Sequence, residues 1–431
     1  MVTSLGGLAM RTFVFLLLSV SALLSAQNPF EAYTLSKQRL VEKDTAGYFY
    51  LAEQAYTLAP FNLEISLNYA RACVTMGRYT RASNLLQFIA DIGFDYGVEN
   101  DSSFAPLWKQ SRFKQIVSKA KEHSTLTASN FAFAVKEKDF IPGGIAYDPR
   151  QQKFYLGSIY KRKIVGVQMD GTVFDFIGES QDGLYSPTSM KIDAARNHLW
   201  VAGTLGNPRA KGMNENEAEQ SAVFQFDLGT HQLIKKYTLT DTVKHRFNDL
   251  VLAGGSVYVT DGKSGTIYII NKETQTIAPL YRWEWILFPE GITVSSDQKY
   301  LFVAHWAGIG RISIADTQAV NLQTKQTTTL TGIDGLAFYE NNLIAVQNAA
   351  GPQARVMKFE LNKQMDAVTK ATVLESQNPL YNLPTTGTVV DDEFYLIANS
   401  QLKNFDAQGA IFPQEKLQPT YILKLKLNAK E

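Results

Sequence analysis

The sequence predicts a mainly β protein: a six-bladed β-propeller preceded by a small α-helical domain. Two observations support this prediction. Downstream of residue 130, apolar and polar residues alternate, turns are rich in Gly, Asp and Asn, and one short unit recurs six times. Upstream, apolar residues follow helical spacing, and comparable helix pairs lie about 33 residues apart.

The repeated unit begins with Pro or an apolar residue, continues with two small or polar residues, and then alternates apolar positions. Its second position falls at Gly143, Thr188, Asn248, Glu290, Asp334 and Thr385. The steps between these positions are 45, 60, 42, 44 and 51 residues, which suits a four-stranded blade with variable loops. A β-sandwich would not give six copies of one register, so we predict a propeller over residues 131–431.

The preceding segment, residues 27–125, predicts a helical domain. Helical spacing is clearest from Ile65 to Met76 and from Ala82 to Ile92, with Gly77 between the two helices. The pattern resembles tetratricopeptide repeats, whose period is roughly 34 residues, although their characteristic Trp is missing. Such repeats bind peptides or protein domains in a concave groove, which predicts a protein partner. A helical cap or spacer beside the propeller is an equal alternative.

Residues 1–26 predict an export signal. Arg11 precedes an apolar run from Phe13 to Leu24, and small residues follow at Ser25 and Ala26. The run is too short to cross a bilayer comfortably, and no other segment reaches the roughly 18 apolar residues of a membrane helix. We therefore predict a periplasmic or secreted protein without a membrane span.

Composition argues against several classes of protein. A formal net charge of +1 over 431 residues gives no electrostatic case for a nucleic-acid partner. A single cysteine, Cys73, excludes an intramolecular disulfide and a cysteine-based metal cage. No Gly-x-Ser-x-Gly or His-Glu-x-x-His pattern occurs, so serine-hydrolase and zinc-protease hypotheses lack their local motifs.

In a propeller the innermost strand of each blade lines the channel, so the six second positions should converge on one channel mouth. The next strand returns to the same end and places an outer ring there: Ser158, Thr204, Asp261, His305, Asn348 and Asn399. Asn248, Glu290 and Asp334 offer oxygen atoms from three consecutive blades, and Ca²⁺ prefers six to eight oxygen ligands. We expect Ca²⁺ or another divalent cation here. The alternative is that these side chains only accept hydrogen bonds from neighbouring backbone N–H groups.

Three phrases resemble the superfamily of gluconolactonases, senescence marker proteins and strictosidine-synthase-like propellers: Arg-Phe-Asn-Asp at 246–249, Pro-Glu-Gly-Ile at 289–292 and Ile-Asp-Gly-Leu at 333–336. The resemblance covers about 300 residues and implies a six-bladed propeller with a divalent ion in its channel. It implies that Asn248 and Asp334 occupy the family's blade-three Asn and blade-five Asp positions. Two positions depart: Gly143 stands where the family has Glu, and Glu290 where it has Asn.

The resemblance implies hydrolysis of lactones or esters, with the cation polarising the carbonyl group. In that hypothesis Asp334 or His305 accepts a proton from the attacking water, and His305 is chosen because it closes the second strand of blade four. The rival hypothesis is a non-catalytic module that binds a protein or ligand through the helical repeats and the propeller face. The aromatic stretch from Tyr281 to Phe288 either walls a substrate mouth or packs between blades, and packing is favoured.

Overall fold

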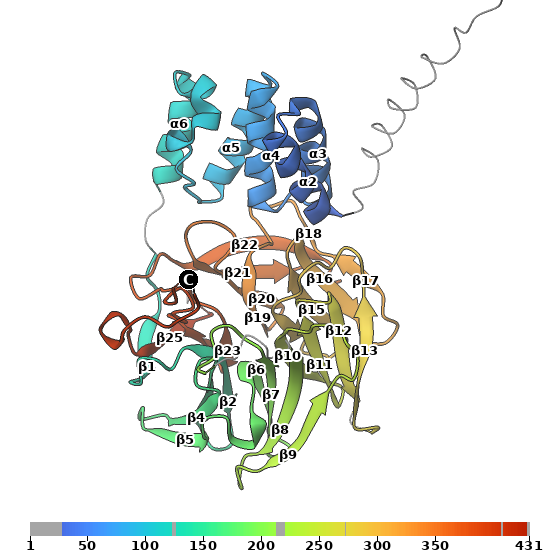
Figure 1. Ribbon diagram of the computed structural model, residues 1–431, viewed down its shortest axis with the longest axis vertical. Coiled ribbons are helices and arrows are strands. Elements are labelled where there is room, and N and C mark those ends of the chain that lie inside the picture. The colour runs from blue at the N-terminus through green and yellow to red at the C-terminus, as the bar shows by residue number, and fades with distance from the viewer. Residues whose placement is uncertain (1–27, 123–125, 213–219, 272, 407, 429–431) are drawn as a thin grey trace, which may run out of the picture. The chain divides into compact units, whose positions relative to one another are not determined.

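The computed structural model describes residues 28–122, 126–212, 220–271, 273–406 and 408–428. The chain divides into a helical unit and a β unit (Figure 1). The helical unit comprises the residues up to Asp91 and Gly97–Lys121, and the β unit comprises Ile92–Tyr96 and the residues from Glu122 onward. The predicted signal segment, residues 1–26, lies outside the described residues.

The helical unit confirms the predicted helical region. Its helices, within the described residues, are α2 (Pro29–Val41), α3 (Thr45–Leu58), α4 (Leu63–Thr75), α5 (Tyr79–Asp91), η1 (Val98–Asn100), η2 (Ser102–Leu107) and α6 (Ser111–Lys121). Pro29 and Leu63, which begin α2 and α4, lie 34 positions apart, as do Thr45 and Tyr79, which begin α3 and α5. This spacing equals the tetratricopeptide period of roughly 34 residues.

Polar side chains begin the helices and join them. Asn28, Asp44 and Asn62 precede α2, α3 and α4, and their side-chain oxygens accept a backbone N–H three residues on, at 2.9, 2.9 and 3.1 Å. In the interior, the Tyr48 hydroxyl donates to the side-chain oxygen of Asn68 at 3.1 Å. The short polar residues before each apolar run therefore fix where the helices start.

The β unit is a six-bladed propeller, which confirms the predicted fold class. Blades one to three are antiparallel sheets of four strands: β2 (Pro142–Asp148), β3 (Lys153–Ser158), β4 (Lys163–Gln168), β5 (Val173–Ile177); β6 (Ser186–Asp193), β7 (His198–Leu205), β8 (Gln220–Asp227), β9 (Leu233–Thr238); β10 (Phe247–Ala253), β11 (Ser256–Asp261), β12 (Thr266–Asn271), β13 (Thr276–Arg282). A short helix, η3 (Gln181–Gly183), joins blades one and two.

Blades four to six continue around the ring: β14 (Ile292–Val294), β15 (Tyr300–His305), β16 (Gly308–Ser313), β17 (Ala319–Asn321); β19 (Ile333–Tyr339), β20 (Asn342–Gln347), β21 (Arg355–Leu361), β22 (Ala367–Ser376); β23 (Gly387–Val390), β24 (Glu393–Ile397), β25 (Thr420–Lys426). In blade five, β18 (Gln323–Thr324) adds a parallel pairing to β22. A short helix, η4 (Gln414–Lys416), precedes β25.

Blade six is completed by β1 (Asn130–Val135), the first strand of the propeller. It pairs antiparallel with β25, so that Asn130 lies opposite Lys424 and Val135 opposite Thr420. The outermost strand of the last blade therefore comes from the beginning of the propeller sequence, and this pairing closes the ring.

The innermost strands share an irregularity at the repeat's second position. In four blades the pairing register shifts there, between Pro142 and Ile145, Pro187 and Ser189, Phe247 and Leu250, and Ile333 and Gly335. A bulge leaves the extra residue outside the ladder and re-aims its side chain. The bulges thus place residues such as Asn248 and Asp334 outside the regular pairing, at the start of the innermost strand.

The third position of the unit is glycine in three blades for a steric reason. A Cβ atom on Gly144 would overlap the backbone of Ser189 in blade two, and one on Gly335 would overlap the backbone of Thr386 in blade six. Gly291 of blade four likewise faces the backbone of blade five. Neighbouring innermost strands approach too closely at these points for any side chain.

Apolar clusters fill the space between neighbouring blades. Trp200 and Tyr237 of blade two, for example, pack with Val257, Tyr268 and Ile270 of blade three. Each fully buried side chain of this size contributes roughly 1.5–3 kcal/mol relative to exposure. The alternating pattern of the sequence therefore places one set of residues at each blade interface.

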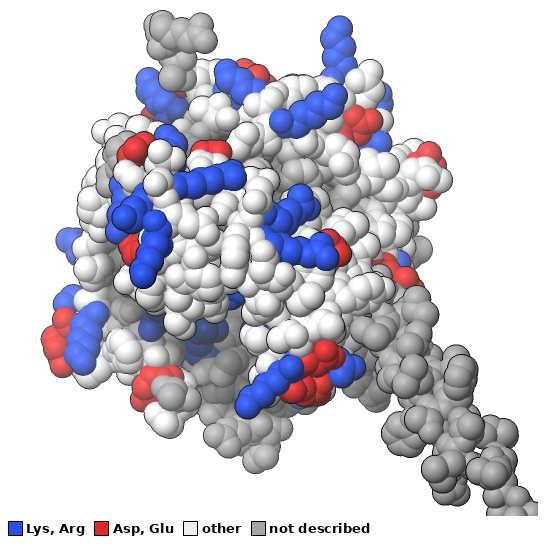
Figure 2. Space-filling model, turned by 90° about the horizontal axis from the view of Figure 1, so that it is seen from above, with Lys and Arg blue, Asp and Glu red and all other residues white. Residues whose placement is uncertain are grey.

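Charged side chains are dispersed on the surface in Figure 2. Lys and Arg are interspersed with Asp and Glu and separated by uncharged residues on the face that is shown. None of the described helices is long and apolar enough to cross a membrane.

Glu375, in β22, anchors the chain that leads into the propeller. Its buried carboxylate accepts hydrogen bonds from the backbone N–H groups of Ala128 and Ser129 at 3.0 and 2.9 Å and from the Ser129 hydroxyl at 2.7 Å. Asn378 and Tyr381 donate to the same carboxylate at 3.0 and 2.5 Å. Burial favours the protonated form, but these donors outweigh it and lower the pKa of Glu375.

We expect Glu375→Gln to destabilise the propeller by about 2–4 kcal/mol, because an amide cannot accept from all these donors at once. The wild type should lose this contribution as the pH falls below about 4.5, since the unfolded carboxyl takes up its proton before the folded one does. Urea unfolding at pH 7 and pH 4 measures both effects. The exposed Glu415→Gln is the control, and equal stability of the two variants would contradict the assignment.

Candidate functional site

The propeller topology brings one end of every blade to the same face. Each innermost strand starts where the adjacent second strand ends, as the pairings of Phe247 with Asp261 and of Pro142 with Ser158 show. Asn248, Glu290 and Asp334 therefore lie at one channel mouth, on three consecutive blades. The sequence prediction of a common mouth follows directly from the strand order.

Glu290 and Asp334 are partly buried at this mouth and influence each other electrostatically. Burial, together with the nearby carboxylates of Asp334 and Asp249, raises the pKa of Glu290 to about 8, against the opposing effect of Arg246. Burial and Asp249 also raise the pKa of Asp334 to about 6, although a hydrogen bond from Asn348 opposes the rise. Both carboxyl groups would be stabilised in their charged form by a nearby cation.

Asn248 is positioned by the blade that follows it. Its side-chain N–H₂ donates to the carbonyl of Pro289 at 2.9 Å, immediately before Glu290. The backbone carbonyl of Glu290 in turn accepts from the Thr260 hydroxyl at 2.7 Å. These bonds hold the Asn248 amide beside the start of blade four.

Several oxygen atoms of the predicted ligand set take part in no hydrogen bond among the described residues. The Asn248 side chain donates through nitrogen, one Asp334 oxygen accepts from Asn348 at 2.7 Å, and the Glu290 carboxylate has no side-chain partner. Within the described residues no group of three or more His, Cys, Asp and Glu side chains could hold a metal ion. The predicted set holds two carboxylates and one amide oxygen, which are oxygen ligands of the type that Ca²⁺ binds and are fewer than the six to eight that it prefers.

Gly143 occupies the blade-one position where the resembled family has Glu. A Cβ atom on Gly143 would collide with the backbone carbonyl of Pro187 and the side chain of Ile159. Blade two thus fills the space that a side chain at residue 143 would need. Glycine at residue 143 therefore satisfies a packing constraint of this propeller, and it also means that blade one supplies no carboxylate at this position.

Asp249 is a buried carboxylate that the sequence analysis missed. It accepts from the Ser189 hydroxyl in blade two at 2.5 Å and from the backbone N–H of Ile292 in blade four at 2.9 Å. Its own blade contributes the backbone N–H of Leu250 at 2.8 Å. Asp249 thereby connects three innermost strands. One signal in the sequence could have revealed this role. Asp249 follows Asn248 directly and occupies a position of the repeated unit that is glycine in three other blades.

His305 closes β15 but turns into blade four. One ring nitrogen contacts the Asn321 side-chain oxygen at 3.0 Å, the other accepts from the backbone N–H of Ala307 at 3.3 Å, and Trp285 packs against the ring. None of these contacts involves Glu290 or Asp334. Burial lowers the pKa of His305 to about 4, so the ring is neutral near pH 7.

The aromatic stretch before blade four packs between blades. Tyr281, Trp283, Trp285 and Ile286 belong to an apolar cluster that also contains residues of blades three and four, among them Leu301. This observation supports the packing interpretation of the stretch.

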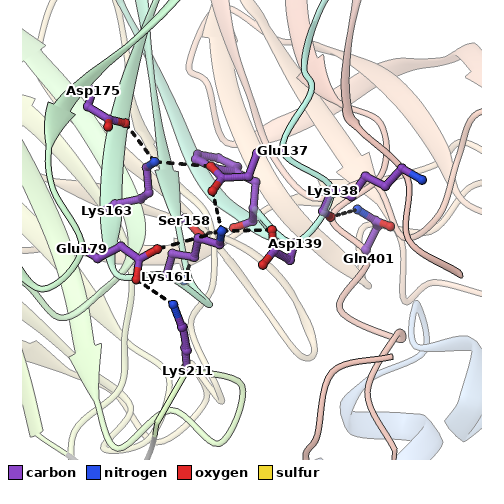
Figure 3. A network of polar contacts seen from close by, with 11 residues as sticks. Glu137, Lys138, Asp139, Ser158, Lys161, Lys163, Asp175, Glu179, Lys211 and Gln401 are labelled. Atoms are coloured by element: carbon purple, nitrogen blue, oxygen red, sulfur yellow. Dashed lines mark hydrogen bonds and ion pairs between the residues drawn. The ribbon is translucent and has the colours of Figure 1, made fainter. Parts of the chain in front are cut away.

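An ionic network lies at the same end of blade one (Figure 3). Lys161 contacts Glu137, Asp139 and Glu179, the last two at 3.0 and 3.9 Å. Burial favours a neutral amine, but the carboxylates outweigh it and raise the pKa of Lys161. Ser158 donates to the carbonyl of Phe140, and Lys161 is held in its charged form, so the two do not form a nucleophile and base.

No family model and no curated protein matches the chain. Solved structures that are similar to it include a gluconolactonase from Xanthomonas campestris, at 14% identity over 68% of this chain and 88% of that chain, with a TM-score of 0.45. Another is an inactive virginiamycin B lyase from Staphylococcus aureus, at 15% identity over 68% and 98% of the two chains, with a TM-score of 0.47. A luciferin-regenerating enzyme matches at 13% identity over 69% and 96%, also with a TM-score of 0.47.

A gluconolactonase is thus among the solved structures that are similar to this chain. At such low identity these matches carry no information about activity. The six-bladed architecture is established by the strand order of the chain itself.

Gly143→Glu should not restore a family-like ligand. The new side chain would collide with Pro187, so we expect a loss of about 2 kcal/mol or more in unfolding free energy and no gain in Ca²⁺ affinity. Urea unfolding and calorimetry measure the two quantities. A stable variant that binds Ca²⁺ more tightly than the wild type would contradict this account of the position.

Glu290 should make the metal-free protein less stable as the pH rises from about 5 to 8, because the folded carboxyl retains a proton that the unfolded chain has released. Glu290→Gln should remove roughly 2 kcal/mol of this decline, since the amide cannot ionise. Urea unfolding across this pH range in chelator measures the slope. The exposed Glu284→Gln should keep the wild-type slope, and an unchanged slope in Glu290→Gln would exclude the raised pKa.

Proposed function

We propose that the propeller mouth binds a divalent cation such as Ca²⁺ and hydrolyses a lactone or ester. The observation that supports this most strongly is the pair of partly buried carboxylates, Glu290 and Asp334, whose pKa values are raised to about 8 and 6 and which lack a direct cationic partner among the described residues. The resemblance of the sequence to gluconolactonase-like propellers supports the same reaction class. We place the reaction outside the cytoplasm, because of the predicted export signal.

In this proposal Asn248, Glu290 and Asp334 hold the cation through oxygen atoms. A bound divalent cation supplies Lewis-acid polarisation of the substrate carbonyl. Asn348 donates to one oxygen of Asp334 and fixes its orientation, so that the second oxygen remains available. Pro289 orients Asn248 through the bond to its side-chain nitrogen.

Asp334 is the better of the two predicted proton acceptors. It lies at the mouth, and its pKa of about 6 in the absence of a cation leaves it mostly ionised near pH 7. A bound cation would favour the ionised form further, and the Asp334 oxygen that does not hold the cation would take up the proton. Both nitrogens of His305 are engaged inside blade four, and its pKa of about 4 makes it a weak base. We therefore assign the proton from the attacking water to Asp334.

The first test is calorimetric titration of the mature protein with Ca²⁺. We expect one site on the wild type and at least a tenfold weaker one on Asp334→Asn, since the variant loses one of two ligand charges. The exposed Asp392→Asn is the matched control and should bind like the wild type. Absence of binding to the folded wild type would overturn the proposal.

Hydrolysis of a lactone and ester panel distinguishes the two proton acceptors. At Ca²⁺ concentrations that saturate each variant, we expect Asp334→Asn to lower kcat/KM by at least 100-fold, as for loss of a general base, and His305→Gln to act mainly on stability. Circular dichroism at the assay temperature confirms that both variants are folded. A folded His305→Gln variant with the larger loss would move the role to His305.

A second candidate is a binding module without catalysis. The 34-residue spacing of the helical unit favours it, because such repeats typically present a peptide-binding groove. Exposed apolar side chains in the same unit, Leu40, Val41 and Tyr50, are available for a protein partner. A folded protein that neither binds Ca²⁺ nor hydrolyses any ester of the panel would make this the preferred function.

A further inference from the structure

A histidine outside the predicted site lies between two carboxylates just before blade three. His245 precedes blade three, and its ring is almost fully buried. One ring nitrogen lies 2.6 Å from a carboxylate oxygen of Asp261, and the other lies 2.7 Å from Asp241. Because both ring nitrogens face acceptors, the doubly protonated imidazolium is the form that satisfies both contacts.

Asp261, the inner partner, organises the loop that follows β11. Its carboxylate is fully buried and accepts from the backbone N–H groups of Lys263 and Ser264 at 2.9 and 3.2 Å. It also accepts from the backbone N–H of Arg246 at 3.0 Å. The same carboxylate that contacts His245 therefore fixes both the turn at residues 262–264 and the start of blade three.

The turn at residues 262–264 packs against the side chain of Asn248, the predicted cation ligand. Any Cβ atom on Gly262 would overlap the side-chain amide of Asn248, and the Arg246 guanidinium lies just beyond. The backbone N–H of Gly262 donates to the carbonyl of Arg246 at 3.0 Å. Asn248 in turn bonds to Pro289, next to Glu290. A chain of direct contacts thus leads from His245 to the mouth.

We propose that His245 is a positioning residue for the channel mouth: held between Asp241 and Asp261, its ring fixes the turn that supports Asn248. The proposal deepens the proposed function, because it concerns how one predicted cation ligand is held. His245 is neither a base nor a metal ligand here, since both of its nitrogens are engaged with carboxylates.

The charge on His245 makes this support dependent on pH. The titratable groups that face the ring are Asp241, Asp261 and the phenol of Tyr268, whose ring centre lies 5.7 Å away. Burial disfavours the charged ring, but the two carboxylates outweigh burial and raise its pKa. The contacts of His245 with Asp241 and Asp261 contribute their full stabilisation below about pH 6.5, the ordinary pKa of histidine. This contribution to the free energy of unfolding is lost as the pH rises through the higher pKa that His245 has in the folded protein.

The test follows the side-chain amide of Asn248 by NMR on the metal-free protein labelled with ¹⁵N-asparagine. The background is Glu290→Gln, in which the adjacent carboxyl group no longer titrates. We expect the Asn248 resonance to shift with a midpoint above pH 6.5 that matches the midpoint of the His245 ring, because the neutral ring keeps one N–H group and can donate to only one of its two carboxylates. Asn248→Asp assigns the resonance, and His245→Gln should abolish this step.

Two further variants make the result decisive. Asp241→Asn removes only the half-exposed outer carboxylate and should lower the midpoint of both resonances together, even if His245→Gln fails to fold. His231→Gln, which changes a ring packed against Phe176, should leave the Asn248 response unchanged. The proposal would be overturned if the Asn248 resonance shifted with a midpoint different from that of the His245 ring. It would also be overturned if the same shift remained in folded His245→Gln. Since no metal is present, this outcome is independent of whether the mouth binds Ca²⁺.

Discussion

The hydrogen bonds that cross from one blade to the next around the channel hold the rest of the structure in place. Innermost strands have no sheet partner on their channel side, so polar groups at the mouth must find partners across a blade boundary. Thr188 donates to the carbonyl of Phe247, Asn248 to that of Pro289 and Asn348 to that of Pro384, at 2.7, 2.9 and 2.8 Å. In each case a short polar side chain donates to the first residue of the repeated unit in the next blade. The same side chains thus link neighbouring blades. The hydrogen bonds that they make determine which side-chain oxygen atoms at the mouth are left to bind a ligand.

Most of the architecture was predictable from the sequence because each blade must satisfy the same steric requirements. The repeated unit located all six innermost strands, although β14 and β23 begin at Ile292 and Gly387, after the residues that the repeat placed first. The site was predictable only in part. Strand order alone sufficed to place Glu290 and Asp334 at one mouth. The orientation of a side chain at a strand end was not predictable, since His305 could turn toward the channel or into its blade, and packing against Trp285 decides this. Nor could the spacing indicate that Asp249 bonds to two neighbouring blades.

The phrases that resemble the lactonase-like family combine two kinds of constraint. The glycine in Pro-Glu-Gly and Ile-Asp-Gly is required because the adjacent strand leaves no room for a Cβ atom. The residue before the glycine differs between blades, as Gly143, Glu290 and Asp334 show. Similarity in these phrases therefore indicates close packing of the innermost strands in a six-bladed ring. It is weaker evidence for a metal site.

The pairing of β1 with β25 has a consequence for how the chain acquires its structure. β25 joins a strand that lies almost three hundred residues earlier in the chain, so the ring stays open until β25 has been synthesised. Until then the edges of β1 and β24 expose unpaired backbone groups that can pair with other chains. Loss of β25 would leave the same edges uncovered permanently. The propeller is thus a structure that only a chain containing both β1 and β25 can complete, and products that lack β25 should aggregate rather than persist as partial rings.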